Sequence, residues 1–125
     1  MIIDFSELKL NDLSPIYLQI VRHIKIKMIN RQVVSGDELP SRRVLSALLE
    51  VNPNTVQKAY KTMEEEGFLI SLAGSKSLLQ FDERLTDKYR KELIEREADR
   101  YIEEVKKMGL DMNAAVELIK ECWDK

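Results

Sequence analysis

The stretch NPNTVQKAYKTMEEEG, at residues 52–67, limits the fold more than any other part of this chain. Asn52 can accept a hydrogen bond as the N-cap of a helix, and Pro53 fits the first turn. Gly67 can take the left-handed conformation in which helices commonly end. The apolar residues between them recur at helical spacing: Val56, Ala59, Tyr60 and Met63. The stretch therefore predicts a helix from Pro53 to Gly67 with one face packed on a core.

A longer helix is predicted to begin near residue 14. Ser14 can cap it through its hydroxyl, and Pro15 has no amide proton to lose at the first helical position. Arg22, Lys25 and Lys27 are expected on its exposed face. The face expected to be buried carries apolar residues at helical spacing: Ile16, Ile20, Val21, Ile24 and Met28.

The segment PSRRVLSALLE predicts a shorter helix, with Ser41 suited to the N-cap position. Its buried stripe is expected to be Val44, Leu45, Leu48 and Leu49. A short turn separates this helix from the one that starts at Pro53, and two helices joined in this way form a helix-turn-helix. Many helix pairs bind nothing, so the pattern alone does not establish a DNA-binding function.

A β-hairpin is predicted directly after Gly67. Two short apolar runs, residues 68–72 and 78–81, flank a polar turn at residues 73–77. Three helices followed by a hairpin form a winged helix-turn-helix. We therefore predict a mainly α fold with a small β-hairpin wing, in which residues 1–80 form a winged helix-turn-helix DNA-binding domain.

Residues 81–125 predict a two-helix dimerisation domain. The composition becomes strongly charged after residue 81, Gly109 can end a first helix, and Asp111 can cap a second. Two amphipathic helices of this size cannot enclose a core alone, so a second copy of the chain is the economical cover and we predict a homodimer. The residues expected at this interface are Ile94, Ala98, Tyr101, Ile102, Val105, Met108, Met112, Ala115, Ile119 and Trp123.

The overall charge does not point to a nucleic-acid partner, because the chain has a formal net charge of -2 and a pI near 5.5. Residues 1–80 carry 10 Lys+Arg against 9 Asp+Glu, whereas residues 81–125 carry 10 against 13. A phosphate-binding site must therefore be a local patch, and the N-terminal half is the better candidate. The start MIIDFSE has an acid where a signal peptide has basic residues, and no apolar run approaches the roughly 20 residues that span a bilayer. We expect a soluble cytoplasmic protein with no membrane partner.

Candidate DNA contacts gather at the starts of the second and third helices. Amides such as Asn54 and Gln57 can pair with base edges, and Thr55 can donate to phosphate or meet a thymine methyl group. A solvated polar face on an ordinary helix is the alternative. Cations at a helix N-terminus oppose the helix dipole, and a bound phosphate would reverse that cost. The predicted DNA-binding residues are Ser41, Arg42, Arg43, Asn52, Asn54, Thr55, Gln57, Lys58, Lys61, Gly74 and Lys76.

No pattern in the sequence indicates an enzyme. The chain has one histidine and one cysteine, and it lacks a glycine-rich phosphate loop and an H-E-x-x-H helix. Its adjacent carboxylates are best interpreted as solvated helix faces. We predict no catalytic residue, no metal site and no cofactor.

These segments together resemble the GntR-type bacterial transcription regulators, and specifically their short YtrA-like subgroup. The match covers nearly the whole chain: SPIYLQI resembles the family's first helix, GDELPSRRVLS its turn and second helix, and VNPNTVQKAYKTMEEEGFLIS its recognition helix. The resemblance implies a homodimer on an inverted-repeat operator that usually represses its own operon, which often includes ABC transporter genes. It also implies DNA contacts at Arg43, at the wing-tip Gly74 and along the recognition helix, at Asn54, Thr55, Gln57 and Lys58.

The wing departs from the family pattern. Ala73 stands where the family has arginine, Lys76 replaces its second glycine and Leu78 replaces an aromatic residue. A winged helix used for protein interaction, without specific DNA binding, is therefore the alternative function. An unknown small-molecule effector also remains open, and so does the choice between repressor and activator.

Overall fold

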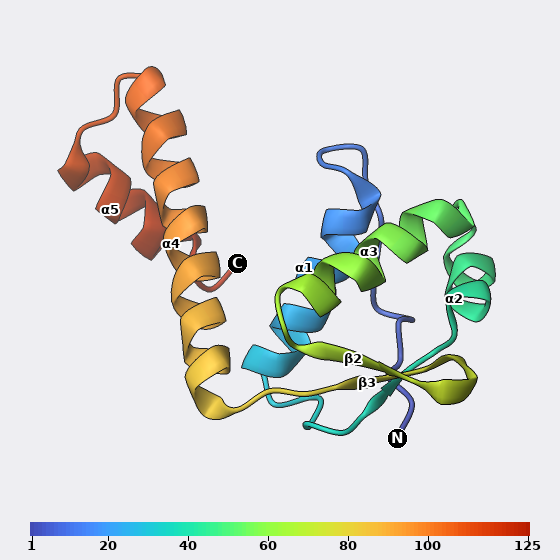
Figure 1. Ribbon diagram of the computed structural model, residues 1–125. Helices are drawn as coiled ribbons and strands as arrows, with labels where there is room; N and C mark the ends of the chain where they lie inside the picture. Colours follow the sequence, from blue (N-terminus) through green and yellow to red (C-terminus); the bar gives the residue numbers. More distant parts are fainter. The chain divides into compact units, whose positions relative to one another are not determined.

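The computed structural model describes the backbone of residues 1–125 and every side chain except that of Ser75. The chain divides into two compact units, Met1–Tyr89 and Arg90–Lys125. Figure 1 shows helices and a β-hairpin in the first unit, whereas the second is made of helices alone. A mainly α fold with a small β-hairpin wing is confirmed.

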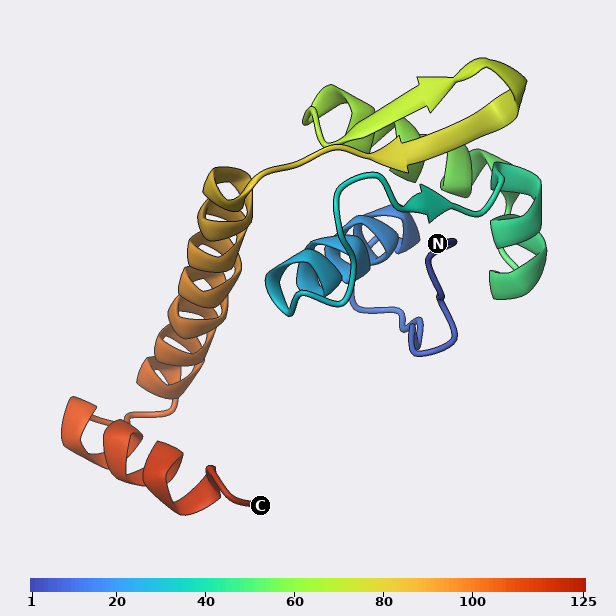
Figure 2. The same ribbon diagram turned by 90° about the horizontal axis from the view of Figure 1, so that it is seen from below.

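The N-terminal unit contains three complete helices, a three-stranded antiparallel sheet and the start of a fourth helix. The helices are α1 (Ile16–Ile29), α2 (Arg42–Leu49) and α3 (Pro53–Glu65). The strands are β1 (Glu38–Leu39), β2 (Leu69–Leu72) and β3 (Lys76–Leu79), in the order β1-β3-β2. Figure 2 shows β2 and β3 as a long ribbon beside the short β1.

The core of this unit is built on α3. All four predicted stripe residues of α3, Val56, Ala59, Tyr60 and Met63, have 0% of their surface exposed. Apolar residues of α1 and the sheet close over them, and the largest contributors are Ile20, Ile24, Met28, Leu39, Phe68 and Leu79. The predicted cap also forms, because the Asn52 side chain accepts a hydrogen bond from the amide of Asn54 at 2.8 Å.

The start of α1 differs from the prediction by one residue. Pro15 itself is the N-cap, and no side chain caps the helix. Ser14 contributes its carbonyl oxygen instead, which accepts a hydrogen bond from Gln19 Nε2 at 2.8 Å. Lys27 was expected to be exposed, but only 8% of its surface is exposed because its stem lies along the core.

The predicted buried stripe of α2 is wrong in part. Ser41 caps the helix as expected and Leu45 is buried, but Val44 and Leu48 are 44% and 66% exposed. Ser46 is buried in their place, since its hydroxyl donates to the carbonyl of Val51 at 2.6 Å. The spacing of apolar residues cannot predict that a polar side chain will be buried when it finds a hydrogen-bond partner.

The wing contains a strand that the sequence did not reveal. β1 adds to β3 with Glu38 opposite Leu78 and Leu39 opposite Ser77, and Leu39 is 1% exposed. The strand β3 also begins at Lys76, two residues earlier than predicted. The turn between β2 and β3 is a short 3₁₀ segment in which Gly74 has φ of 80°, a conformation that favours glycine.

Helix α4 (Glu83–Lys107) begins within the N-terminal unit. Tyr89 is 2% exposed, and its ring packs edge-on against Phe68 with 5.4 Å between ring centroids. Its hydroxyl lies 3.1 Å from Glu66 Oε1, and Lys25 Nζ lies 2.9 Å from the same oxygen. The boundary between the two compact units therefore lies between residues 89 and 90, inside α4. The assignment of separate DNA-binding and dimerisation domains stays a prediction.

The C-terminal unit consists of the rest of α4 and of α5 (Met112–Cys122). Asp111 caps α5 as predicted, and the Tyr101 hydroxyl donates to the carbonyl of Ala115 at 2.9 Å. Among the described residues of this unit only Val105, at 9% exposed, is buried, so the contact between the two helices is small. Large apolar side chains remain exposed in this unit: Ile94, Ile102, Met108, Met112, Val116, Leu118, Ile119 and Trp123.

Among the helices that the structure describes, none is long and apolar enough to cross a bilayer.

Candidate nucleic-acid interface

The N-terminal half of α3 presents polar side chains opposite its buried stripe. Asn54, Gln57, Lys58 and Lys61 are exposed and Thr55 is half-buried. Short amide and hydroxyl groups on a stiff helix are suited to the major groove, where base edges offer donors and acceptors. The predicted residues of α3 therefore lie together on one solvent-facing surface.

The start of α2 adds two more of the predicted residues, Ser41 and Arg43. The Ser41 Oγ accepts from the amide of Val44 at 3.2 Å, which leaves its O–H able to donate to phosphate. Arg43 is exposed at the second residue of the helix, where the amides also attract anions. In the same way, Asn52 uses its oxygen for the cap and keeps its NH₂ group as a donor.

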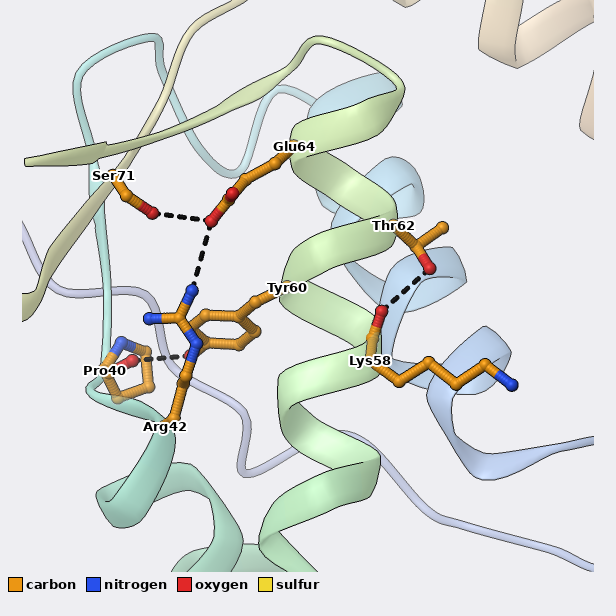
Figure 3. A network of polar contacts seen from close by, with 7 residues as sticks. All are labelled: Pro40, Arg42, Lys58, Tyr60, Thr62, Glu64 and Ser71. Atoms are coloured by element: carbon orange, nitrogen blue, oxygen red, sulfur yellow. Dashed lines mark hydrogen bonds and ion pairs between the residues drawn. The ribbon is translucent and has the colours of Figure 1, made fainter.

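Arg42 lies differently, because its side chain turns toward α3 (Figure 3). Its Nη2 is 3.1 Å from Glu64 Oε1, and its guanidinium lies over the Tyr60 ring at 4.9 Å from the centroid. The side chain is 29% exposed. The structure thus separates two neighbouring arginines that the sequence placed in one group.

Tyr60 connects α3 to Pro40, two residues before the start of α2. Its buried hydroxyl donates to the carbonyl of Pro40 at 2.5 Å. Burial raises the pKa of this hydroxyl well above its usual value, and the positive charge of Arg42 offsets part of that rise. The hydrogen bond fixes the start of α2 relative to α3.

Tyr17 was missed by sequence reasoning. Lys58 Nζ lies over the Tyr17 ring, 4.3 Å from its centroid, so a residue of α1 holds a predicted DNA-binding cation. Figure 3 shows Lys58 pointing away from Arg42, toward α1. The two residues are far apart in the sequence and meet only through the packing of α1 on α3, so no sequence pattern predicts their contact.

The wing contributes two predicted residues, Gly74 and Lys76, at and beside its tip. Both are exposed, and so are Leu72 and Ala73 before them. Gly74 takes its positive φ in the turn, as a wing-tip glycine would. The wing therefore presents one cation on a largely uncharged tip.

In the described part of the chain, no three His, Cys, Asp or Glu side chains gather in a way that could hold a metal ion. The single histidine, His23, packs its ring against Phe5 with 5.3 Å between centroids. Burial lowers the pKa of this imidazole, and the neighbouring charge of Lys27 lowers it further.

The chain is similar to a family of DNA-binding regulators. Residues 16–77 match the family model described as bacterial regulatory proteins, gntR family. This span runs from the first residue of α1 to β3, so it contains the helix-turn-helix and most of the wing.

Individual relatives extend the match over most of the chain. The HTH-type transcriptional repressor YtrA of Bacillus subtilis is 35% identical over 108 residues, which cover 86% of this chain and 78% of YtrA. The HTH-type regulator YhcF of the same organism is 30% identical over 107 residues, covering 86% of this chain and 88% of YhcF. A GntR family transcriptional regulator from Listeria monocytogenes has a similar structure, with a TM-score of 0.78, 30% identity and coverage of 90% of this chain and 98% of that one.

The raised pKa of Tyr60 predicts a loss of stability in alkali. The folded protein holds the phenol proton more tightly than the unfolded chain, so this contribution is complete below pH 10 and is lost as pH rises above it. Tyr60→Phe removes that dependence, and it costs about 1 kcal/mol at pH 8 because the Pro40 carbonyl loses its donor. Urea unfolding of both proteins from pH 8 to 11 should show their difference shrinking above pH 10 by up to about 1.4 kcal/mol per pH unit. If the difference in unfolding free energy between the two proteins stays constant from pH 8 to 11, the pKa of Tyr60 is not raised by folding.

Proposed function

The chain belongs to the gntR family of bacterial regulatory proteins, in its YtrA-like subgroup, and on that premise we propose that it binds an inverted-repeat operator as a homodimer and represses transcription. The members of this family are DNA-binding transcription regulators and not enzymes. The operator symmetry, the dimer and the repression are the proposal.

One observation carries the proposal: α3 exposes amides and cations on one side while its opposite side is fully buried. Asn54 and Gln57 are placed to hydrogen-bond with base edges in the major groove, and Thr55 to meet a thymine methyl group or a phosphate. A helix fixed by a buried stripe presents these groups in one geometry, which sequence readout requires.

Phosphate contacts are assigned to the groups that flank the base-reading residues. Arg43 and Ser41 at the start of α2 would bind one stretch of backbone, with the amide of Asn52. Lys58 and Lys61 would neutralise phosphates along the groove, and the wing would reach the backbone through Lys76 and the turn at Gly74.

The homodimer is proposed from the exposed apolar surface of the C-terminal unit. Ile94 on α4, Met112 at the start of α5 and Trp123 at the C-cap of α5 are 62%, 77% and 79% exposed. A second copy would cover these side chains, together with Ala98, Ile102, Met108 and Ile119. Three predicted interface residues already have contacts within the unit, since Val105 is buried and Tyr101 is hydrogen-bonded to Ala115, and we propose that they support the interface from behind. A two-fold axis between the copies would match an operator that is an inverted repeat.

Repression is proposed because YtrA, a relative along most of the chain, is named a repressor. The resemblance to the YtrA-like subgroup is the basis on which we further propose that the protein acts in the cytoplasm and controls its own operon, including ABC transporter genes.

Binding to the DNA immediately upstream of the gene tests the proposal. Fluorescence anisotropy near 0.15 M salt should give a dissociation constant at least about 1,000-fold lower for this duplex than for a shuffled one. Equal and weak binding to both duplexes would contradict it and favour a winged helix used for protein interaction.

Two substitutions should separate base contacts from phosphate contacts. Gln57→Ala should reduce discrimination between single-base operator variants by about 1–3 kcal/mol at one position. Arg43→Ala should weaken binding to all sequences and lower the slope of log K against log salt by about 1. Arg96→Ala, which removes an exposed arginine from α4, is the matched control and should change neither. An unaltered base preference in Gln57→Ala would remove that residue from the readout.

The dimer interface is tested by placing a charge on the exposed apolar surface. Ile102 is 45% exposed, and Ile102→Glu should raise the dimer dissociation constant at least about tenfold, because the carboxylate would be buried without a partner. Sedimentation velocity should show the wild-type protein near twice the chain mass of 14.6 kDa and the variant shifted toward one chain. Asn113→Glu adds the same charge at an exposed polar position and should leave the dimer intact. A wild-type protein that sediments as one chain would rule out the dimer.

A further inference from the structure

Arg42 and Arg43 are adjacent in sequence but have different surroundings. Arg43 is exposed, whereas the Arg42 guanidinium lies on the Tyr60 ring and pairs with Glu64. Successive residues of a helix point about 100° apart, so one arginine faces solvent while the next faces α3. The two residues therefore meet different groups.

Glu64 joins three elements of the N-terminal unit. Its Oε1 atom is 3.1 Å from Arg42 Nη2 at the start of α2, and it accepts a hydrogen bond from Ser71 Oγ of β2 at 2.5 Å. Glu64 itself belongs to the last two turns of α3. Figure 3 shows this chain of contacts passing from α2 through α3 to the wing strand. We call Arg42, Glu64 and Ser71 the wing junction.

The wing junction also explains why a cation is tolerated at this position. The N-terminus of α2 carries a partial positive charge, which disfavours arginine. The carboxylate of Glu64 offsets that repulsion, and the face of the Tyr60 ring adds a favourable contact. Both partners are less than two-fifths exposed, at 29% and 35%, so solvent screens the pair only in part.

We propose that Arg42 is a positioning residue that fixes the wing and α2 on the recognition helix through Glu64 and Ser71, and does not contact DNA phosphate. This assignment rests on the proposed DNA-binding function and revises one residue of its interface. It gives the wing, which has a weakly charged tip, a defined place from which Lys76 reaches the DNA backbone.

The test measures wing attachment and DNA binding separately. Arg42→Met keeps the apolar stem over Tyr60 and removes the charge, and Ser71→Ala removes one hydroxyl. Each should speed amide hydrogen exchange at residues 69–72 roughly tenfold in the free protein. Ser71→Thr keeps a hydroxyl and should restore the wild-type rate. Hydrogen exchange is measured without DNA, so it tests whether the wing junction holds the wing even if the protein proves not to bind the operator.

Salt dependence then separates positioning from phosphate contact. Arg42→Met should weaken operator binding with an unchanged salt slope, whereas Arg43→Met should lower the slope by about 1. Glu64→Ala should also weaken binding although it removes a negative charge, and the matched Glu65→Ala, at an exposed neighbour, should not.

The opposite pattern would overturn the proposal. If Arg42 binds phosphate and Glu64 merely competes for it, Arg42→Met lowers the salt slope and Glu64→Ala strengthens binding. Exchange at residues 69–72 that is unchanged in both Arg42→Met and Ser71→Ala would likewise show that the wing junction does not hold the wing.

Discussion

The burial of Tyr60 is the contact on which the surface of the N-terminal unit depends. Its ring fills the core from α3, and its hydroxyl satisfies the carbonyl of Pro40, the last residue but one before α2. A phenol placed there decides where α2 starts relative to α3, because neither the ring nor the hydrogen bond tolerates a large shift. The orientation of Ser41 and Arg43 toward solvent follows from that placement.

The parts of the fold that sequence predicted are those set by local rules. The α3 helix, its Asn52 cap and its buried stripe depend on residues within a few turns of one another, and all are confirmed. The strand β1 was not foreseen, because two residues carry no periodicity and their pairing with β3 joins distant segments. The predicted burial of α2 was wrong at Leu48 and Ser46 for a different reason. An eight-residue helix has few neighbours to cover its apolar side chains, and a hydroxyl that finds a hydrogen-bond partner can be buried in place of one.

The candidate interface stays a prediction, but the contacts of its residues can be compared with what the sequence indicates. Residue type and helix position suffice to predict that Asn54, Gln57 and Arg43 are exposed. The contact of Lys58 with Tyr17 and the pairing of Arg42 with Glu64 depend on tertiary packing. This packing also explains why the low pI of the chain does not exclude a local basic surface. Glu64 near the end of α3 pairs with Arg42, and Glu66 at its C-cap pairs with Lys25, so two of the acidic residues are neutralised within the unit. A whole-chain charge is therefore a poor guide to the field at one helix.

The burial of Tyr89 has a consequence for where this chain can be divided. A fragment that stops at the end of the hairpin would lack the ring that packs on Phe68 and the hydroxyl that meets Glu66. It would keep Lys25 and Glu66 but expose their pair to water along with the apolar wall behind it. The smallest self-sufficient piece thus extends two turns into α4. A recombination event or a protease that separates the two halves cleanly would have to act within a continuous helix and not in a flexible linker.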